Sequence, residues 1–409
     1  MNIKSIKSTI YLYIIFALIL LLCVIIFSPD KMVFDERFFI PNIKTLEQYG
    51  FSFAFLRNMT GQSPGPLYQY IYYSIGHIIP LTPKSMRVIN YFFLLGNLYL
   101  LQLLARMDQE KNAILVPLLI VGIPMTWSIS GMAMTEWPSL FFCLLSVLLL
   151  RKALATHTKF SFALSALAGL SAGTAIIGRS PFLMVLPAAF MLYSLPHRKN
   201  NVSIFILSSM IFPAILFYAW KGLVPPDLQS LQSGFNLTFL CLGFLYFAIT
   251  TIIIYPGLFN IKRIHYFIGV IVIILSFIIN AFFFKLSYTP MNGVVTSNLI
   301  PQSVRILYPY IFFPVAFGAS YIFLVSLLIH FIENEQNTWR LFYLIISILI
   351  MVTTIKSTAH FSSRYVMQAY PFFLLYIASN IKINKYLLIR IVIGTIIGII
   401  SLYRCYQVF

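Results

Sequence analysis

Charged residues are scarce in this sequence. Only 9% of the 409 residues are Asp, Glu, Lys or Arg, and just 10 residues are acidic. Soluble domains carry about 25% charged residues, so the composition excludes a soluble globular protein. Of the chain, 60% is hydrophobic and 17% is aromatic, which indicates a protein embedded in a membrane.

Cysteine is also scarce, and nothing in the sequence has the spacing of a metal site. The 4 cysteines form no C-x-x-C pair, no Asp-x-Asp pair occurs, and the phosphate-binding motif GxxxxGK[ST] is missing. The missing phosphate-binding motif argues against a nucleotide-hydrolysing transporter. We interpret the cysteines as small buried hydrophobic residues, and we predict no disulfide framework, no metal and no cofactor.

Apolar runs recur along the whole chain at the length needed to cross a bilayer, which is roughly 20 residues. Such runs predict helices, because a transmembrane barrel has segments of about 10 residues that alternate in polarity. We therefore predict an all-α polytopic membrane protein, a single domain over residues 1–409. About thirteen spans are expected, at roughly 9–27, 86–105, 113–130, 134–150, 160–177, 181–196, 202–220, 235–258, 266–284, 308–331, 341–356, 365–381 and 387–405.

The formal net charge of +18 is explained by membrane topology and requires no nucleic-acid partner. With the N-terminus in the cytoplasm, every short turn on that side carries Lys or Arg, as the positive-inside rule expects. The outer side then holds two longer segments, at about 28–85 and 285–307. Over residues 42–57, apolar and polar residues alternate loosely at helical spacing. We therefore expect a helix that lies on the membrane surface in the first of these loops.

Three of the rare acids lie at predicted outer ends of spans. Asp35 and Glu36 follow the first span directly, and Glu136 stands where the chain re-enters the membrane. Acids at membrane depth are costly and tend to be functional, and a carboxylate there suits a general base. The alternatives are a solvated pair that ends the first helix, and a Glu136 that only complements a helix N-terminus.

Several cations also lie on the predicted outer side, where the positive-inside rule disfavours them. Arginine and lysine near a membrane are natural phosphate ligands, so these residues indicate a site for a lipid phosphate. The alternative for any one of them is a side chain that extends to the outer-leaflet headgroups. The candidates are Arg179, Arg305, Lys356, His360 and Arg364.

Five short elements of the sequence have a counterpart in a known family. They are Asp35-Glu36-x-Phe38-x-Ile40-Pro41, Ser63-Pro64-Gly65-Pro66-Leu67-Tyr68, Thr135-Glu136, the turn at Arg179, and Arg364-Tyr365 with Pro371 downstream. Together they resemble the GT-C membrane glycosyltransferases, in particular the alpha-1,2-glucosyltransferases that use dolichyl-phosphate glucose in lipid-linked oligosaccharide assembly, or a bacterial relative that uses an undecaprenyl-linked donor. The resemblance covers much of the first 190 residues and a short piece near 360–371. It departs at Gly65-Pro66-Leu67, where the family has a simpler Pro-Gly-Leu order, and at Ser180-Pro181, where the eukaryotic enzyme has Gln and Thr.

The resemblance implies a GT-C-like helix bundle and an inverting transfer of a hexose. The donor would be a polyprenyl-phosphate sugar, and the acceptor a lipid-linked glycan or another acceptor outside the cytoplasm. Asp35 would be the general base, with Glu36 and Glu136 orienting the acceptor or the base. Arg364 and Arg179 would hold the phosphate, joined by further residues near the outer helix ends: Tyr365, Lys356, His360 and Arg305. The site would face the periplasm of a bacterial inner membrane, or the lumen of the endoplasmic reticulum.

Two other functions remain open at this point. A transporter or flippase of lipid-linked sugars would also need a polar path, but transporters tend to place ionisable groups at the midplane in two related halves. A polymerase or ligase of surface polysaccharide would share the outer-face chemistry but would centre it on a large late loop.

Overall fold

The structure, a computed structural model, describes residues 3–108, 113–156, 158–196, 198–230, 234–286, 302–334, 337–357 and 361–408. Within these ranges the chain forms helices, turns and loops, and no strand. The α-helices in chain order are α1 (Ile3–Ile26), α2 (Glu36–Tyr49), α3 (Phe53–Asn58), α4 (Leu67–Gly76), α5 (Pro83–Met107), α6 (Leu115–Val121), α7 (Pro124–Gly131), α8 (Glu136–Ala155), α9 (Phe160–Gly178), α10 (Val185–Ala189), α11 (Lys199–Ser209), α12 (Ile211–Trp220), α13 (Leu237–Ile254), α14 (Arg263–Ile279), α15 (Gln302–Asn334), α16 (Thr338–Val352), α17 (Val366–Ile377) and α18 (Lys385–Val408).

The predicted all-helical polytopic fold is confirmed. Ten helical segments of the described chain are long and apolar enough to cross a membrane: Ser8–Ile26, Pro83–Met107, Glu136–Ala155, Phe160–Gly178, Lys199–Trp220, Leu237–Ile254, Arg263–Phe284, Tyr310–Glu333, Thr338–Lys356 and Lys385–Gln407. Each coincides with one of the thirteen expected spans. The protein is therefore an integral multi-pass membrane protein.

The other three expected spans are short or broken helices. Residues 113–130 divide into α6 and α7 at Gly122, because Pro124 lacks an amide hydrogen for a continuing helix. Residues 181–196 form α10 with a 3-10 helix on either side. In the region 365–381, α17 has 12 residues and contains Pro371. At 1.5 Å per residue it is about 18 Å long, too short for a bilayer core of about 30 Å.

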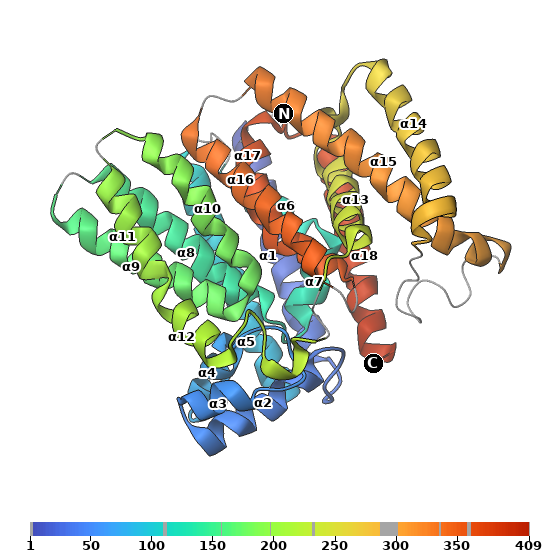
Figure 1. The fold of residues 1–409 in the computed structure, drawn as a ribbon. Helices are drawn as coiled ribbons and strands as arrows, with labels where there is room; N and C mark the ends of the chain where they lie inside the picture. The colour runs from blue at the N-terminus through green and yellow to red at the C-terminus, as the bar shows by residue number, and fades with distance from the viewer. Residues whose placement is uncertain are drawn as a thin grey trace.

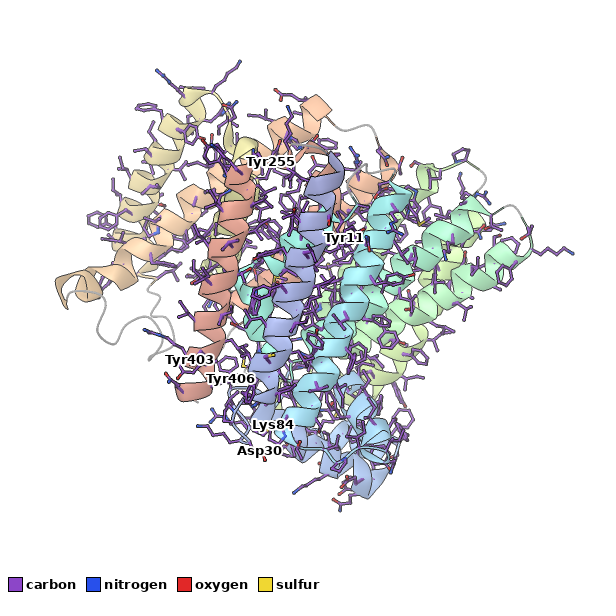
Figure 2. All side chains as sticks on the ribbon, turned by 180° about the vertical axis from the view of Figure 1, so that it is seen from behind. Tyr11, Asp30, Lys84, Tyr255, Tyr403 and Tyr406 are labelled. Atoms are coloured by element: carbon purple, nitrogen blue, oxygen red, sulfur yellow. The ribbon has the colours of Figure 1, made fainter. Side chains whose placement is uncertain are left out.

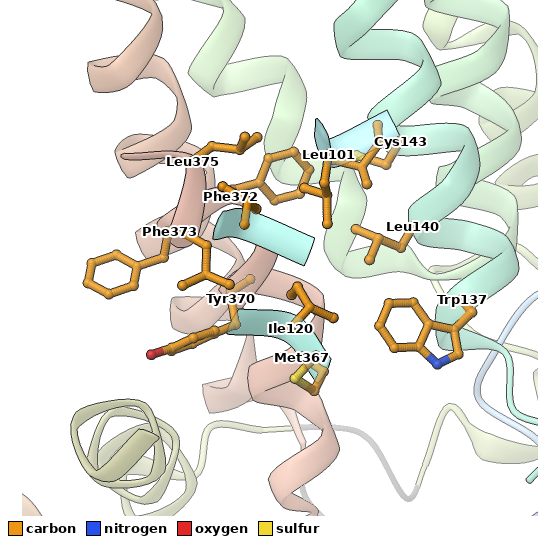
Figure 3. Packing of buried hydrophobic residues seen from close by; sticks show 14 of the residues in the cluster. Leu101, Ile120, Trp137, Leu140, Cys143, Met367, Tyr370, Phe372, Phe373 and Leu375 are labelled. Atoms are coloured by element: carbon orange, nitrogen blue, oxygen red, sulfur yellow. The ribbon is translucent and has the colours of Figure 1, made fainter. Parts of the chain in front are cut away.

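Two of these short helices, α6 and α17, form the centre of the molecule instead of facing lipid. Every residue of α6 and of α17 is buried, as is typical of helices that are apolar all round. Figure 3 shows part of this core, where Phe372 of α17, Leu101 of α5 and Leu140 of α8 approach one another. α18 packs closely on the break after α6, because a Cβ atom on Gly394 would lie 2.0 Å from the Gly122 carbonyl oxygen.

The three short helices of the first long loop gather at one end of the bundle (Figure 1). α1 ends at this end and α5 begins there, whereas the N-terminus lies at the opposite end. The expected surface helix over 42–57 is observed as α2 and α3, which are separated at Gly50 with its φ of +62°. α2 buries Phe39, Ile43 and Leu46 on one face. The second predicted loop, 285–307, lies mostly outside the described residues.

Candidate active site

A cavity of about 210 Å³ is built from five separate parts of the chain. Because Phe38 and Phe39 of α2 line it, the cavity belongs to the end of the bundle that carries α2, α3 and α4. Two arginines and one carboxylate lie among mostly apolar neighbours in its wall. The lining residues are Asp35, Phe38, Phe39, Gly61, Gln62, Ser63, Pro64, Arg179, Leu228, Arg364 and Tyr365.

Asp35 occupies the N-cap position of α2, but its carboxylate caps no backbone amide. It instead accepts a hydrogen bond and forms an ion pair with Nη2 of Arg364, from the 3-10 turn Ser363–Tyr365. Phe34, just before it, has a left-handed φ of +52°, a conformation that is strained for a bulky residue and often marks functional sites. Asp35 is therefore a residue at a helix end whose carboxylate binds a distant arginine instead of its own helix.

Glu136 begins α8 and lies behind the cavity wall with a side chain that is 3% exposed. Its Oε1 accepts a hydrogen bond from Nη2 of Arg179, and Nε of Arg364 lies 3.4 Å from the same oxygen. Arg364 thus bridges Asp35 and Glu136, which are 101 positions apart in the sequence. This arrangement brings together four residues that the sequence analysis selected separately.

The four charged groups do not satisfy one another. Within the described residues, Nε of Arg179, Nε of Arg364 and Oε2 of Glu136 are buried and make no hydrogen bond. Buried polar atoms in folded proteins nearly always make a hydrogen bond, so each exception needs an explanation. Unused guanidinium donors beside a cavity have the chemistry of a site for an anion.

The electrostatics differ between the two arginines. Burial lowers the pKa of Arg179, and the attraction of Glu136 does not fully offset this. Burial also acts to lower the pKa of Arg364, but the carboxylates of Asp35 and Glu136 outweigh it, so that the pKa is raised above its ordinary value. Burial thus outweighs the single carboxylate partner of Arg179, whereas the two carboxylates beside Arg364 outweigh burial.

Residues 61–65, called the cavity loop below, reach the turn at Arg179 through a contact that only glycine permits. Gly65 donates its amide hydrogen to the Gly178 carbonyl over 3.2 Å, and a Cβ atom on Gly65 would lie 1.9 Å from the Ile177 carbonyl oxygen. Next to it, the buried Gln62 accepts from Gln69 Nε2 over 2.8 Å. The loop is therefore fixed against the end of α9, where Arg179 follows directly.

The sequence matches no family model and no curated protein. One solved structure is similar. It is the crystal structure of ArnT from Cupriavidus metallidurans bound to undecaprenyl phosphate, with a TM-score of 0.45 and 11% sequence identity. The similarity covers 99% of this chain and 76% of that chain. A similarity this distant identifies no residue of the cavity.

Glu36 is not brought to the cavity, although it was selected with Asp35. Its carboxylate is completely buried and pairs with Arg87, with 2.7 Å between Oε2 and Nη2. Backbone amides of Val33 and Ala133 complete its hydrogen bonds. The physical reason is that consecutive residues at the start of a helix point in different directions, so Glu36 faces α5 while Asp35 faces the cavity.

Of the four remaining predicted phosphate ligands, the structure places one at the cavity. Tyr365 lines the cavity. Lys356 is exposed, does not line the cavity, and places its ammonium 4.0 Å from the ring centroid of Phe235. His360 lies outside the described residues, and Arg305 lies in α15, where its side chain is not described.

Arg87 was missed by the sequence analysis. It lies in the expected span 86–105 and is fully buried. An arginine inside a transmembrane segment is by default a candidate functional residue whose partner must be sought. That signal was present in the sequence, but the partner, Glu36, lies 51 positions away.

Proposed function

We propose that this protein is an integral-membrane glycosyltransferase that transfers a sugar from a polyprenyl-phosphate donor to an acceptor hydroxyl outside the cytoplasm. The observation that carries the proposal is Arg364, which bridges Asp35 and Glu136 at a cavity where guanidinium donors remain unused. The resemblance of the surrounding sequence elements to GT-C enzymes supports the same assignment. The sugar, the linkage and the acceptor are left open.

The phosphate of the donor would bind to Arg179 and Arg364. Charge-assisted hydrogen bonds from arginine to phosphate are strong and directional. The leaving phosphate gains negative charge as the bond to the anomeric carbon breaks, and preorganised cations stabilise such developing charge. Both arginines line the cavity, so both side chains can reach a phosphate bound there.

Asp35 would act as the general base. Its carboxylate takes the proton of the acceptor hydroxyl, the acceptor oxygen forms a bond to the anomeric carbon, and the bond from that carbon to the phosphate oxygen breaks. Asp35 has the most exposed side chain of the four charged residues, at 26%, so it is the carboxylate that an acceptor reaches. The charge of Asp35 is paired with Arg364 in the structure, and a bound phosphate would compete for that arginine.

The size of the cavity limits what it holds. Pockets for drug-sized ligands measure about 300–1,000 Å³, whereas this one measures about 210 Å³. A single sugar with its phosphate is the part of the donor that suits it. The polyprenyl chain and most of the acceptor would then lie outside the cavity.

The decisive experiment compares the wild-type protein with Asp35→Asn. Purified protein in detergent or lipid receives labelled polyprenyl-phosphate hexoses and a mixture of lipid-linked acceptors, and release of polyprenyl phosphate is followed. We expect the wild type to consume at least one donor, and Asp35→Asn to be slower by about 10²–10⁴-fold, the usual contribution of a general base.

Two outcomes contradict the proposal. If Asp35→Asn turns over normally, Asp35 is not the base. If the wild type consumes no donor but moves the labelled lipid across the bilayer of a vesicle, the protein is a flippase and not a transferase.

A further inference from the structure

The second turn of α5 carries an arginine that lies outside the cavity and is fully buried. All five N–H groups of Arg87 are used. Nε and Nη2 donate to the two carboxylate oxygens of Glu36 over 2.9 and 2.7 Å. Nη2 also donates to the Lys31 carbonyl over 2.7 Å, and Nη1 donates to Ser28 Oγ and the Pro29 carbonyl over 2.7 and 2.8 Å. Arg87 thereby ties the segment that leads to Asp35 to a membrane-spanning helix.

Glu36 extends this connection to the second acid of the site. Its Oε1 accepts from the Ala133 amide over 2.7 Å, and Ala133 precedes Glu136 by three residues. Glu36 itself follows Asp35 directly in the sequence. One buried ion pair therefore holds the backbone beside both carboxylates that Arg364 bridges.

α5 holds the Glu136 segment at two further points. Asn90 Nδ2 donates to the carbonyls of Ile129 and Met132 over 2.8 and 2.7 Å, and Asn97 Nδ2 donates to the Trp137 carbonyl over 2.9 Å. Arg87, Asn90 and Asn97 share one face of the helix at its period of 3.6 residues. α5 begins at a well-defined residue, since Thr82 and Ser85 form a capping box.

The last helix, α18, packs against the ion pair of Arg87 and Glu36 through Tyr406. The Tyr406 ring lies 5.0 Å from the Arg87 guanidinium carbon, and its hydroxyl donates to the Gly131 carbonyl. Figure 2 shows Tyr406 at the end of the bundle that also carries Asp30 and Lys84, close to the start of α5. Tyr406 therefore contacts Arg87 and also binds the segment that leads to Glu136.

We propose that Arg87 is a positioning residue of the transfer reaction. Acting through Glu36, it sets the separation and the direction of Asp35 and Glu136 without touching the substrate. This inference rests on the proposed function above. Catalytic groups must be held within about 0.5 Å of their productive positions, and a misplacement of about 1 Å costs roughly 10²-fold in rate.

The test compares Arg87→Lys with a matched control, Arg151→Lys. Lysine keeps the charge, but its single ammonium cannot replace the planar fork of an arginine. Arg151 is also buried and paired, with 2.6 Å to Asp108 at the other end of α5, far from the cavity. Turnover of the polyprenyl-phosphate hexose and hydrogen–deuterium exchange of both variants are measured.

In Arg87→Lys we expect kcat to fall about 10–100-fold, while KM for the donor changes less than about threefold, because misplaced groups slow the reaction more than they weaken binding. Peptides covering residues 28–40 and 129–137 should exchange at least about tenfold faster. Arg151→Lys should keep the kcat, the KM and the exchange of these two peptides. Should Arg87→Lys fail to fold, Asn90→Ala loosens the Glu136 segment alone, and a smaller fall in kcat is expected.

The inference is overturned if the two peptides exchange no faster in Arg87→Lys than in Arg151→Lys. It is also overturned if both variants lose kcat equally, because the role of Arg87 is then only structural. If the wild type consumes no donor, the proposed function fails by itself, and the exchange data still decide whether Arg87 holds the two acids.

Discussion

Asp35 and Glu36 are neighbours in the chain, yet they belong to two different kinds of ion pair. Glu36 is completely buried and accepts four hydrogen bonds, two of them from Arg87. Asp35 is 26% exposed, lines the cavity and pairs with Arg364. The first pair is closed to any ligand, whereas the second pair is open to one.

The arginines of the two pairs show the same contrast. Arg87 donates a hydrogen bond from every N–H that it has, whereas the buried Nε of Arg179 makes no hydrogen bond among the described residues, and the buried Nε of Arg364 has only its ion pair with Glu136 at 3.4 Å. A saturated buried ion pair is a structural element that is costly to break. An ion pair at a cavity that has unused hydrogen-bond donors can exchange one partner for a substrate. The number of unused donors therefore distinguishes the substrate-binding pair from the structural pair better than burial does.

After Asp35→Asn, the largest loss of turnover is expected from Arg364→Gln, which removes the bridge between Asp35 and Glu136. Loss of one charge-stabilising donor costs about 10²–10³-fold in turnover, and we expect a loss of this size in donor consumption. Arg37→Gln is the matched control, because Arg37 is exposed and does not line the cavity. Retention of more than about a tenth of the rate by Arg364→Gln would contradict a direct role in the reaction.

The closed pair, Glu36 with Arg87, should instead control the free energy of unfolding. Glu36→Gln leaves Arg87 buried opposite an uncharged partner, and breaking a buried pair costs about 3–5 kcal/mol in the free energy of unfolding. Asp35→Asn should change that free energy by less than about 1 kcal/mol, since a partly exposed pair contributes little. Denaturation of both variants in detergent micelles measures the difference, and the reverse order of stability would refute the comparison.

A smaller effect is expected from Gly65→Ala. The new Cβ atom would lie 1.9 Å from the Ile177 carbonyl oxygen, so the cavity loop or the Arg179 turn must move. We expect donor consumption to fall about tenfold, as for a misplaced binding group. Gly50→Ala is the control for a substitution without a steric clash, because a Cβ atom on Gly50 would meet nothing within 4 Å, although the Gly50 φ of +62° strains any residue other than glycine. Equal rates for the two variants would show that this contact does not shape the cavity.

The smallest effect is expected from Lys356→Ala. Lys356 is exposed and interacts with the Phe235 ring, an interaction worth about 0.5–1 kcal/mol at exposed sites. We expect the initial rate of donor consumption to stay within about twofold of the wild type. A loss of tenfold or more would show that Lys356 reaches the phosphate once the donor is bound, as the sequence alone suggested.

The sequence determined that this protein crosses a membrane many times, and it selected four charged residues that the structure brings into contact. Apolar runs reveal helices because the bilayer core offers no partner for backbone hydrogen bonds. Charged side chains are so costly there that the few present stand out, and Asp35, Glu136, Arg179 and Arg364 were all selected in this way. Their convergence on one cavity was expected but could not be derived from positions so far apart in the chain.

Only the tertiary structure decided which apolar helices face lipid and which face protein. α14 and α17 have similar composition, yet the first exposes most of its apolar side chains and every residue of the second is buried. Lipid and a protein core are almost equally apolar solvents for a side chain, so hydropathy cannot separate them. In the same way, the tertiary structure alone assigned Asp35 to an open ion pair and Glu36 to a closed one, because each depends on an arginine supplied by a distant segment.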